Sequence, residues 1–180
     1  MGIATGAGHI FGVTGGVMEA ALRTAYNFVT GENPDADAFH EVRFEGPERG
    51  WREKTFDLPD RQLKIAVASG LTNADALCRA LERGEVSYDF VEIMACPGGC
   101  VGGGGQPIIE GINLSADRGC TLRIIDEQSE LRFSHENPAV QACYDDFLGE
   151  PLSERAEELL HSNHADWSMP IRMTADGTQA

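Results

Sequence analysis

Apolar residues recur at helical spacing near the start of the chain. After residues 14–16, apolar residues recur every three or four positions, as on one face of a helix: Val17, Ala20, Ala21, Ala25 and Phe28. This spacing is typical of a helix with a single buried face, and the helix is predicted to end near Thr30-Gly31. Gly12, Gly15 and Gly16 precede it, where backbone amides can either approach a ligand or form a tight turn between helices.

Short alternating and β-branched segments predict four strands. Segments 41–44 and 51–56 alternate polar and apolar residues on either side of a turn rich in glycine and proline, which predicts an antiparallel hairpin. The apolar runs Leu63–Ala68 and Phe90–Met94 enclose the segment Asn73–Arg83, whose apolar residues have helical spacing. Strand, helix and strand in this order predict a parallel crossover unit.

The second half of the chain is predicted to be mostly helical. A helix is expected over residues 114–128, and another begins at Asn137-Pro138, a helix cap followed by a proline in the first turn. Ser153 is expected to cap a last helix that ends near Leu160. The pattern therefore predicts an α/β fold, with a mixed, mostly parallel sheet flanked by helices and a helical C-terminal part. One domain covers residues 1–165, and residues 166–180 form a loose tail.

Charge and composition narrow the classes of partner. The 180 residues carry a net charge of −15, with 42% hydrophobic and 24% charged residues, as in a soluble globular protein. No apolar run approaches the roughly 20 residues that a membrane helix needs, and no secretory signal is visible, so we expect a cytoplasmic protein. The negative charge argues against nucleic acid or a membrane as partner, because both attract basic surfaces.

The most informative segment follows the run Phe90–Met94, where Cys96 and Cys100 stand among many glycines. The end of a buried parallel strand is where such sheets bind ligands. Gly98 and Gly99 allow unusual backbone angles, so both thiols can turn toward one centre, and the glycines that follow, Gly103 and Gly104 among them, leave room for a bulky cofactor.

Three kinds of chemistry compete for the two cysteines. A redox disulfide is disfavoured because three residues separate the cysteines instead of two. A structural zinc site needs four ligands in recognisable pairs, and the sequence has no second suitable pair. A cubane iron-sulfur cluster takes four thiolates, so it would need two more from elsewhere. Cys78 and Cys143 lie on apolar faces of predicted helices and are expected to be buried core residues.

The cysteine-rich segment resembles a signature of the iron-only, or [FeFe], hydrogenases. That signature has the form M-x-C-x-x-x-C-x-x-G-G-G-Q-P, and Met94 through Pro107 satisfies every position. Thr5–Arg23 is similar to a glycine-rich stretch of the same family, and Ser134–Pro138 and Leu159–His161 are similar to its C-terminal part. The resemblance implies that the chain is the C-terminal lobe of the hydrogenase catalytic domain.

The resemblance also implies a cofactor, a reaction and roles for individual residues. Cys96 would ligate the [4Fe-4S] cubane of the H-cluster, and Cys100 would bridge the cubane to a di-iron subsite. Met94 and Phe11 would line the di-iron pocket, and Gly98, Gly99, Gly103 and Gly104 would adjoin the cofactor. The implied reaction interconverts protons and electrons with H2, and the cofactor supplies that chemistry.

Two further signatures of the family, which carry the other cubane cysteines, have no counterpart in this sequence. The resemblance therefore implies a complementary N-terminal half or subunit, with ferredoxin or NAD(P)-linked subunits as electron partners. A second interpretation is a non-catalytic iron-sulfur binding or assembly protein that shares the cysteine loop. A third is an inert truncated lobe, whose apolar surface would be exposed where its partner is missing.

Overall fold

The computed structural model describes residues 2–43, 50–59 and 61–161. The chain forms two compact units, residues 1–141 and residues 142–180. Within the described ranges, no helix has the length and apolar character that a membrane crossing requires. The predicted loose tail, residues 166–180, lies outside the described residues.

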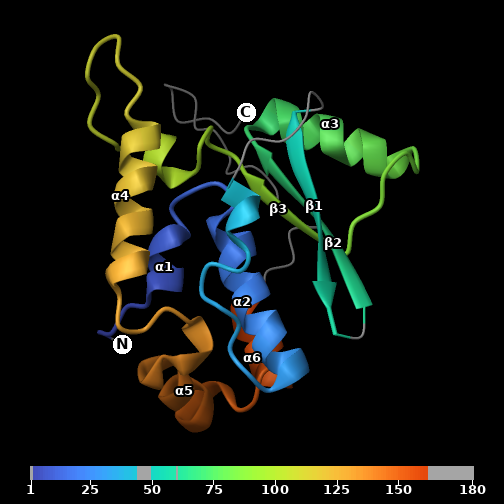
Figure 1. Ribbon diagram of the computed structural model, residues 1–180, viewed down its shortest axis with the longest axis vertical. Coiled ribbons are helices and arrows are strands. Elements are labelled where there is room, and N and C mark those ends of the chain that lie inside the picture. The colour runs from blue at the N-terminus through green and yellow to red at the C-terminus, as the bar shows by residue number, and fades with distance from the viewer. Residues whose placement is uncertain (1, 44–49, 60, 162–180) are drawn as a thin grey trace, which may run out of the picture. The chain divides into compact units, whose positions relative to one another are not determined.

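A mixed three-stranded sheet organises the first unit (Figure 1). Its strands are β1 (Trp51–Leu58), β2 (Arg61–Ser69) and β3 (Phe90–Met94). The central strand, β2, pairs antiparallel with β1 and parallel with β3, so that Ile65 lies between Lys54 and Phe90. The helix α3 (Leu71–Glu82) connects β2 to β3, which confirms the predicted parallel crossover unit and the α/β fold class.

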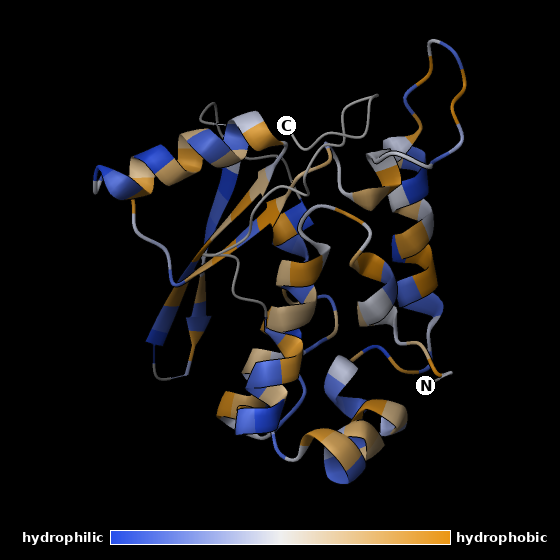
Figure 2. Cartoon of the chain, turned by 180° about the vertical axis from the view of Figure 1, so that it is seen from behind, coloured by the Kyte–Doolittle hydropathy of each residue, from blue (hydrophilic) through white to orange (hydrophobic). Residues whose placement is uncertain are grey.

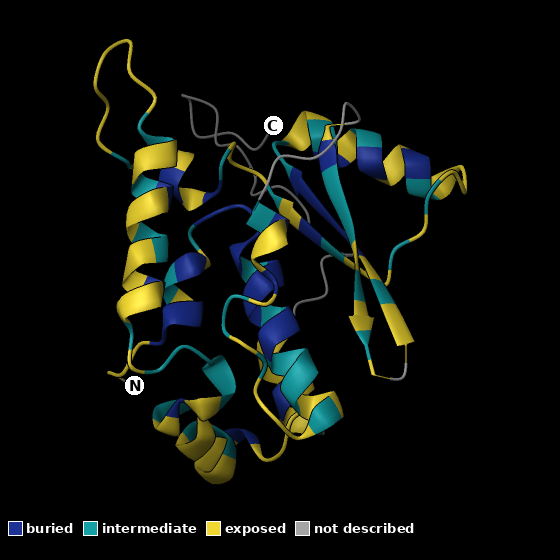
Figure 3. Ribbon diagram, viewed as in Figure 1, coloured by how far each residue is buried: buried dark blue, intermediate teal, exposed yellow. Residues whose placement is uncertain are grey.

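Helices cover both faces of the sheet, which explains why β2 is apolar without alternation. Ile65 and Val67 face the helix α2 (Gly16–Thr30), in a core made of Met18, Leu22, Phe39, Val42, Ile65 and Val67. Ala66 and Ala68 face α3 in a second core made of Trp51, Ala66, Ala68, Leu77 and Ala80. Figure 3 shows the buried positions along α2 and in the middle of the sheet.

Two further helices lie beyond α2, the first in contact with α2 and the second packed against the first. They are α1 (Gly6–Ile10), whose N-terminus is capped by the hydroxyl of Thr5, and α4 (Ser115–Gln128). The α4 helix confirms the expected helix over residues 114–128. The sequence pattern did not reveal α1, because the segment is a single turn rich in glycine. Its residues Ala7 and Ile10 are nonetheless fully buried.

A buried network of ion pairs ties α4 to α2. Arg23 of α2 donates to both carboxylate oxygens of Asp126 on α4, over 2.9 and 2.8 Å, and also donates to Glu19 over 2.7 Å. All three of these side chains are fully buried. Arg132 and Arg43 pair with Asp126 and Glu19 from the edge of the network. The arginines neutralise these carboxylates, so the group is better suited to structural support than to binding a metal ion.

The predicted hairpin between segments 41–44 and 51–56 is wrong. His40–Arg43 forms a 3₁₀ turn, and the partner of β1 is β2, which follows it in the chain. Val42 is the buried residue of that turn, and Arg43 is used in the ion-pair network, so the apparent alternation came from tertiary contacts. Phe44 lies outside the described residues.

Cys78 was predicted to be a core residue, and this prediction is also wrong. The side of α3 that packs on the sheet carries Ala74, Leu77 and Ala80, whereas Cys78 is exposed. One position along a helix turns a side chain by about 100°, which carries Cys78 away from the face of Leu77. Cys143 is half-buried.

The helical C-terminal part agrees with the sequence pattern. Asn137 precedes α5 (Pro138–Cys143), and its side-chain oxygen accepts a hydrogen bond from the amide of Ala139 over 2.9 Å. The second unit contains a π-helical turn, Tyr144–Leu148, and α6 (Glu154–Leu160). Ser153 caps α6 by accepting a hydrogen bond from the amide of Ala156 over 3.1 Å, as predicted.

A loop with an apolar tip, residues 104–113, projects beyond the end of α4 (Figures 1 and 2). Ile108 is 94% exposed, and Ile109 and Ile112 are 50% and 58% exposed. A turn closed by the amide of Ile112 and the carbonyl of Ile109 shapes the tip. Exposed apolar surface of this kind is typical of a site of interaction with another molecule.

Candidate functional site

The two cysteines of the signature lie in a loop at the carboxyl end of β3. This cysteine loop, residues 95–107, begins directly after Met94, and its 3₁₀ turn Cys100–Gly102 follows Cys96 closely. The end of β2 lies beside it, since the amide of Gly70 donates to the carbonyl of Met94 over 2.8 Å. The loop thus occupies the edge of the sheet where parallel strands place ligands.

Backbone hydrogen bonds attach the cysteine loop to the segment before α2. The carbonyl of Gly98 accepts from the amide of Thr14 over 3.0 Å, and the amide of Val101 donates to the carbonyl of Gly12 over 3.1 Å. The amide of Gly98 donates to the hydroxyl of Ser69 over 2.8 Å. Cys100 therefore lies between two fixed peptide groups, and its loop is held on a rigid support.

Gly99 permits this close contact. Its φ of +97° lies in the left-handed region, and a Cβ at this position would come within 2.7 Å of the carbonyl oxygen of Gly12. Any other residue would push the loop away from its support. The sequence predicted a role for this glycine beside the cofactor, and the structure gives it a structural reason as well.

Both thiols are exposed, and neither is in a disulfide. A Cβ at Gly103 would lie 3.1 Å from the sulfur of Cys96, so the absence of a side chain leaves space around this thiol. Gly98 has a positive φ of 81°, and a Cβ at Gly104 would meet nothing within 4 Å. The loop thus leaves open space around its sulfurs.

The other two predicted site residues adjoin the loop. Met94 is half-buried at the end of β3. Phe11 follows α1 and is 46% exposed, and its neighbour Gly12 accepts the hydrogen bond from Val101. Both residues therefore flank the backbone that supports the cysteine loop.

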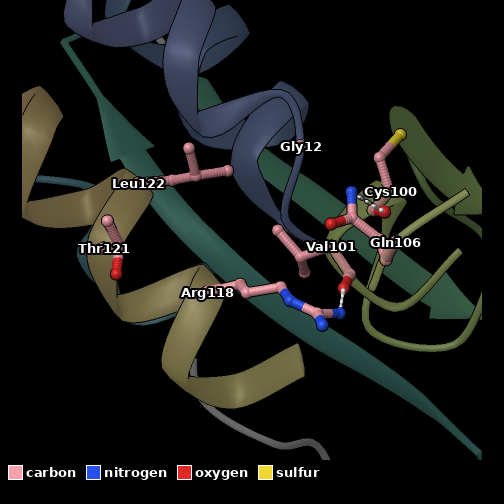
Figure 4. Close-up of a pocket in the computed structure, with 7 residues that line it drawn as sticks. All are labelled: Gly12, Cys100, Val101, Gln106, Arg118, Thr121 and Leu122. Carbon is pink, nitrogen blue, oxygen red and sulfur yellow. Dashed lines mark hydrogen bonds between the residues drawn. The ribbon is translucent and has the colours of Figure 1, made fainter. Parts of the chain in front are cut away.

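A pocket of about 430 Å³ lies between the cysteine loop and α4 (Figure 4). Its lining residues come from the loop, from α4 and from the segment before α2: Gly12, Cys100, Val101, Gln106, Arg118, Thr121 and Leu122. Figure 4 shows the sulfur of Cys100 pointing away from the side chains of α4. The side-chain amide of Gln106 donates to the backbone carbonyl of Cys100 over 3.2 Å. The pocket therefore lies behind the backbone of Cys100, on the side opposite to its thiol.

Glu92 of β3 holds the segment before α2, to which the cysteine loop is bonded. Its carboxylate accepts hydrogen bonds from the amides of Gly15 over 2.6 Å and Met18 over 2.7 Å, at the N-terminus of α2. Burial raises the pKa of Glu92, and the two amides oppose that shift. This contact spans β3 and α2, so the sequence pattern, which shows only neighbours along the chain, gave no sign of it.

Three arginines line a second pocket, of about 350 Å³, beside Gly98: Arg43, Arg52 and Arg123. Arg123 lies 3.6 Å from a carboxylate oxygen of Glu19. Burial lowers the pKa of Arg123, and the like charge of Arg43 adds to this effect. The back of the cysteine loop therefore lies beside three arginines, of which Arg43 and Arg123 pair with Glu19.

The donor set fits part of an iron-sulfur cluster. Two exposed thiols on one glycine-rich loop, with space left around the sulfur of Cys96, are suited to bind a bulky inorganic group. Among the described residues, no third cysteine or histidine joins them in a group that could hold a metal ion. A cubane takes four thiolates, so this loop can provide half of the ligands.

Comparisons with known proteins show the family of the chain. The family model of the iron-only hydrogenase large subunit, C-terminal domain, matches residues 1–104, and that of the iron hydrogenase small subunit matches residues 114–167. The NADP-reducing hydrogenase subunit HndD of Solidesulfovibrio fructosivorans is 47% identical over 165 residues, which make up 91% of this chain and 28% of that protein.

Two other similar proteins differ in their named roles. A solved structure of [FeFe]-hydrogenase HydA1 from Chlamydomonas reinhardtii has 40% identity and a TM-score of 0.64, covering 83% of this chain and 44% of that one. Cytosolic iron-sulfur assembly component 3 of Mus musculus is 32% identical over 160 residues, covering 87% of this chain and 32% of that protein. The chain spans less than a third of the length of these curated relatives.

Proposed function

The chain belongs to the iron-only hydrogenase large-subunit family, in its C-terminal domain, and on this premise we propose that it holds part of the H-cluster of an [FeFe]-hydrogenase. Cys96 would hold the [4Fe-4S] cubane, and Cys100 would hold both the cubane and the di-iron subsite. The observation that carries the proposal is the pair of exposed thiols on a glycine loop whose backbone is fixed to the body of the protein.

The bound cofactor supplies the interconversion of protons and electrons with H2. The residues of this chain hold and surround it. Gly98 and Gly99 let the loop turn back on itself, and Gly103 and Gly104 leave room beside the sulfurs. Met94 and Phe11 border the di-iron side of the site, where apolar side chains limit the access of water.

The remaining ligands come from outside this sequence. Two thiolates complete half of a cubane, so a complementary N-terminal half or subunit provides the other two. Ferredoxin or NAD(P)-linked subunits are the proposed electron partners, and a cytoplasmic location stays a prediction from the sequence. The similarity to HndD, named as a subunit of an NADP-reducing hydrogenase, supports a multi-subunit setting.

Hydrogen evolution from reduced viologen, measured together with iron content, tests the proposal. The chain is expressed with hydrogenase maturation proteins, purified without oxygen, and assayed alone and together with an N-terminal hydrogenase part. Activity is expected in the combined sample and is expected to be lost in Cys100→Ser, whereas Cys78→Ser, an exposed cysteine on α3, keeps the activity. Absence of activity in the combined sample contradicts a hydrogenase role.

The similarity to the mouse iron-sulfur assembly component favours a second function, non-catalytic cluster binding or assembly. The same experiment separates the two functions. Iron bound through Cys96 and Cys100, without hydrogen evolution in the combined sample, supports the assembly role. A chain that binds no iron under either condition is an inert fragment.

A further inference from the structure

We propose that Arg118 is a positioning residue for the cysteine loop, through which the segment similar to the small subunit controls the surroundings of Cys100. This inference rests on the proposed function, because it concerns the cluster that the loop would hold. Arg118 lies on α4, within residues 114–167, the part matched by the small-subunit model. Cys100 lies within the part matched by the large-subunit model.

One guanidinium group holds both sides of the glycine run. Arg118 Nη1 donates to the carbonyl of Val101 over 3.1 Å, and Nη2 donates to the carbonyl of Pro107 over 2.5 Å. Val101 directly follows Cys100, and Pro107 ends the glycine run after Gln106. The rigid, planar fork of an arginine can fix two carbonyl groups at once, which a lysine cannot do with the same geometry. Figure 4 shows Arg118 reaching across the pocket to Val101.

The glycine run needs such an external restraint. Residues 102–105 are four glycines in succession, and glycine gains more backbone freedom than any other residue when it is not held. Within this run, Gly104 and Gly105 have nothing within 4 Å of an added Cβ, so side-chain packing does not fix them. Beside the backbone hydrogen bonds of the loop, the side chains of Arg118 and Gln106 therefore help to fix its path behind Cys100.

The helix that carries Arg118 is itself firmly held. Farther along α4, fully buried Asp126 forms its paired hydrogen bonds with Arg23 of α2. At Gly119, the residue after Arg118, a Cβ would lie 3.0 Å from the side chain of Val13, so α4 is in close contact with the segment before α2. The position of Arg118 is thus set by the core of the protein, and Arg118 adds a further restraint to a loop that is also bonded to Gly12, Thr14 and Ser69.

The charge of Arg118 has a second effect. In the described part of the chain its hydrogen bonds go to carbonyl groups, and no carboxylate pairs with it. A positive charge held on the carbonyl of Val101, the residue after Cys100, favours the more negative, reduced form of a cluster bound by this loop. Arg118 therefore raises the reduction potential of the cubane as well as fixing its ligand loop.

An electrochemical titration of the cubane, followed by electron paramagnetic resonance, tests both effects. The samples are the assembled protein, formed with the N-terminal hydrogenase part, as parent, Arg118→Gln and Arg118→Lys. Arg118→Gln is expected to lower the midpoint potential and to broaden the cluster signal. Arg118→Lys is expected to keep the potential near that of the parent, because it keeps the charge, but to broaden the signal, because it loses the fork.

Arg79→Gln is the matched control. It removes one positive charge from the exposed face of α3, where Arg79 pairs with Asp75, and it is expected to change neither the potential nor the signal. If Arg118→Gln binds iron like the parent and has the same potential and line shape, the inference is overturned while the proposed function stands. If the parent assembly binds no iron, both are overturned. If Arg118→Gln loses iron and Arg118→Lys retains it, the positioning role is overturned, because lysine keeps the charge without the fork.

Discussion

Replacing Asp126 by asparagine is expected to destabilise the chain strongly. Oδ2 of Asp126 accepts hydrogen bonds from Arg23 over 2.8 Å and from Arg132 over 2.7 Å, and Oδ1 accepts from Arg23 over 2.9 Å. Asparagine can keep one oxygen facing the arginines, but it replaces the other with an amino group that cannot accept. Asp126→Asn therefore loses about two charge-assisted hydrogen bonds, each contributing about 1.5–3 kcal/mol.

The cost of breaking a buried ion pair gives a similar loss in the free energy of unfolding. Arg23 is fully buried, so the change leaves its charge with one fewer partner in a site without access to water. Breaking a buried ion pair from one side costs about 3–5 kcal/mol, which agrees with the sum over the lost hydrogen bonds. Because this network joins α4 to α2, the free energy of unfolding of the first unit is expected to fall by roughly that amount.

Urea unfolding followed by circular dichroism measures the loss. Asp75→Asn is the control, because Asp75 pairs with Arg79 where both side chains are 63% exposed, and such a pair contributes about 0–1 kcal/mol. A loss for Asp126→Asn no larger than that of the control would refute the reasoning, because it would mean that the buried pairs add no net stability.

The same variant carries a pH signature. Burial alone would raise the pKa of Asp126, but the hydrogen bonds and charges of Arg23 and Arg132 outweigh it and lower the pKa below 3.8. A carboxyl with a lowered pKa in the folded state contributes stability above its unfolded pKa and loses it as the pH falls through the folded pKa. The difference between parent and Asp126→Asn is therefore expected to shrink below about pH 4.

Three further changes test the support of the cysteine loop. Gly99→Ala introduces a Cβ 2.7 Å from the carbonyl of Gly12 at a positive φ. We expect a strain of about 1–3 kcal/mol and reduced iron binding in the assembled protein. Gly104→Ala, which has open space around its Cβ, is the control and should bind iron like the parent. Ser69→Ala removes the acceptor for the amide of Gly98, and its expected cost of about 1–3 kcal/mol in urea unfolding would be contradicted by an unchanged midpoint. Burial raises the pKa of Glu92 above 4.5, so the parent is expected to lose some stability as the pH rises through that pKa. Glu92→Gln should remove this pH dependence. An identical pH profile of stability in the two proteins would contradict the raised pKa of Glu92.

The sequence predicted those parts of the fold that depend on neighbouring residues. The crossover unit β2–α3–β3 and the caps at Asn137 and Ser153 could be read from short-range spacing and cap chemistry, and the structure confirms them. The hairpin at segment 41–44 was wrong because burial of Val42 and ion pairing of Arg43 come from distant partners. A pattern of polar and apolar residues does not distinguish such contacts from strand alternation.

The sequence predicted the candidate ligands, which stay a prediction, and gave no sign of the residues that support their loop. Cys96, Cys100 and the glycines of the loop stand in one continuous signature, which the family comparison confirms as hydrogenase-like. Ser69, Glu92 and Arg118 act on the loop from other elements, through hydrogen bonds that cross 17 to 77 positions of the chain. Their residue types are ordinary, so only the folded structure reveals what they hold.

The connector 105–113 has a consequence for how α4 reaches its place. It joins the two parts that separate family models match, residues 1–104 and 114–167, within one polypeptide. A short flexible tether keeps two binding surfaces at an effective concentration of about a millimolar, whatever the amount of protein present. The pairing of Asp126 on α4 with Arg23 on α2 is therefore independent of dilution in this chain, whereas two separate polypeptides would have to meet by diffusion before the same ion pair could form.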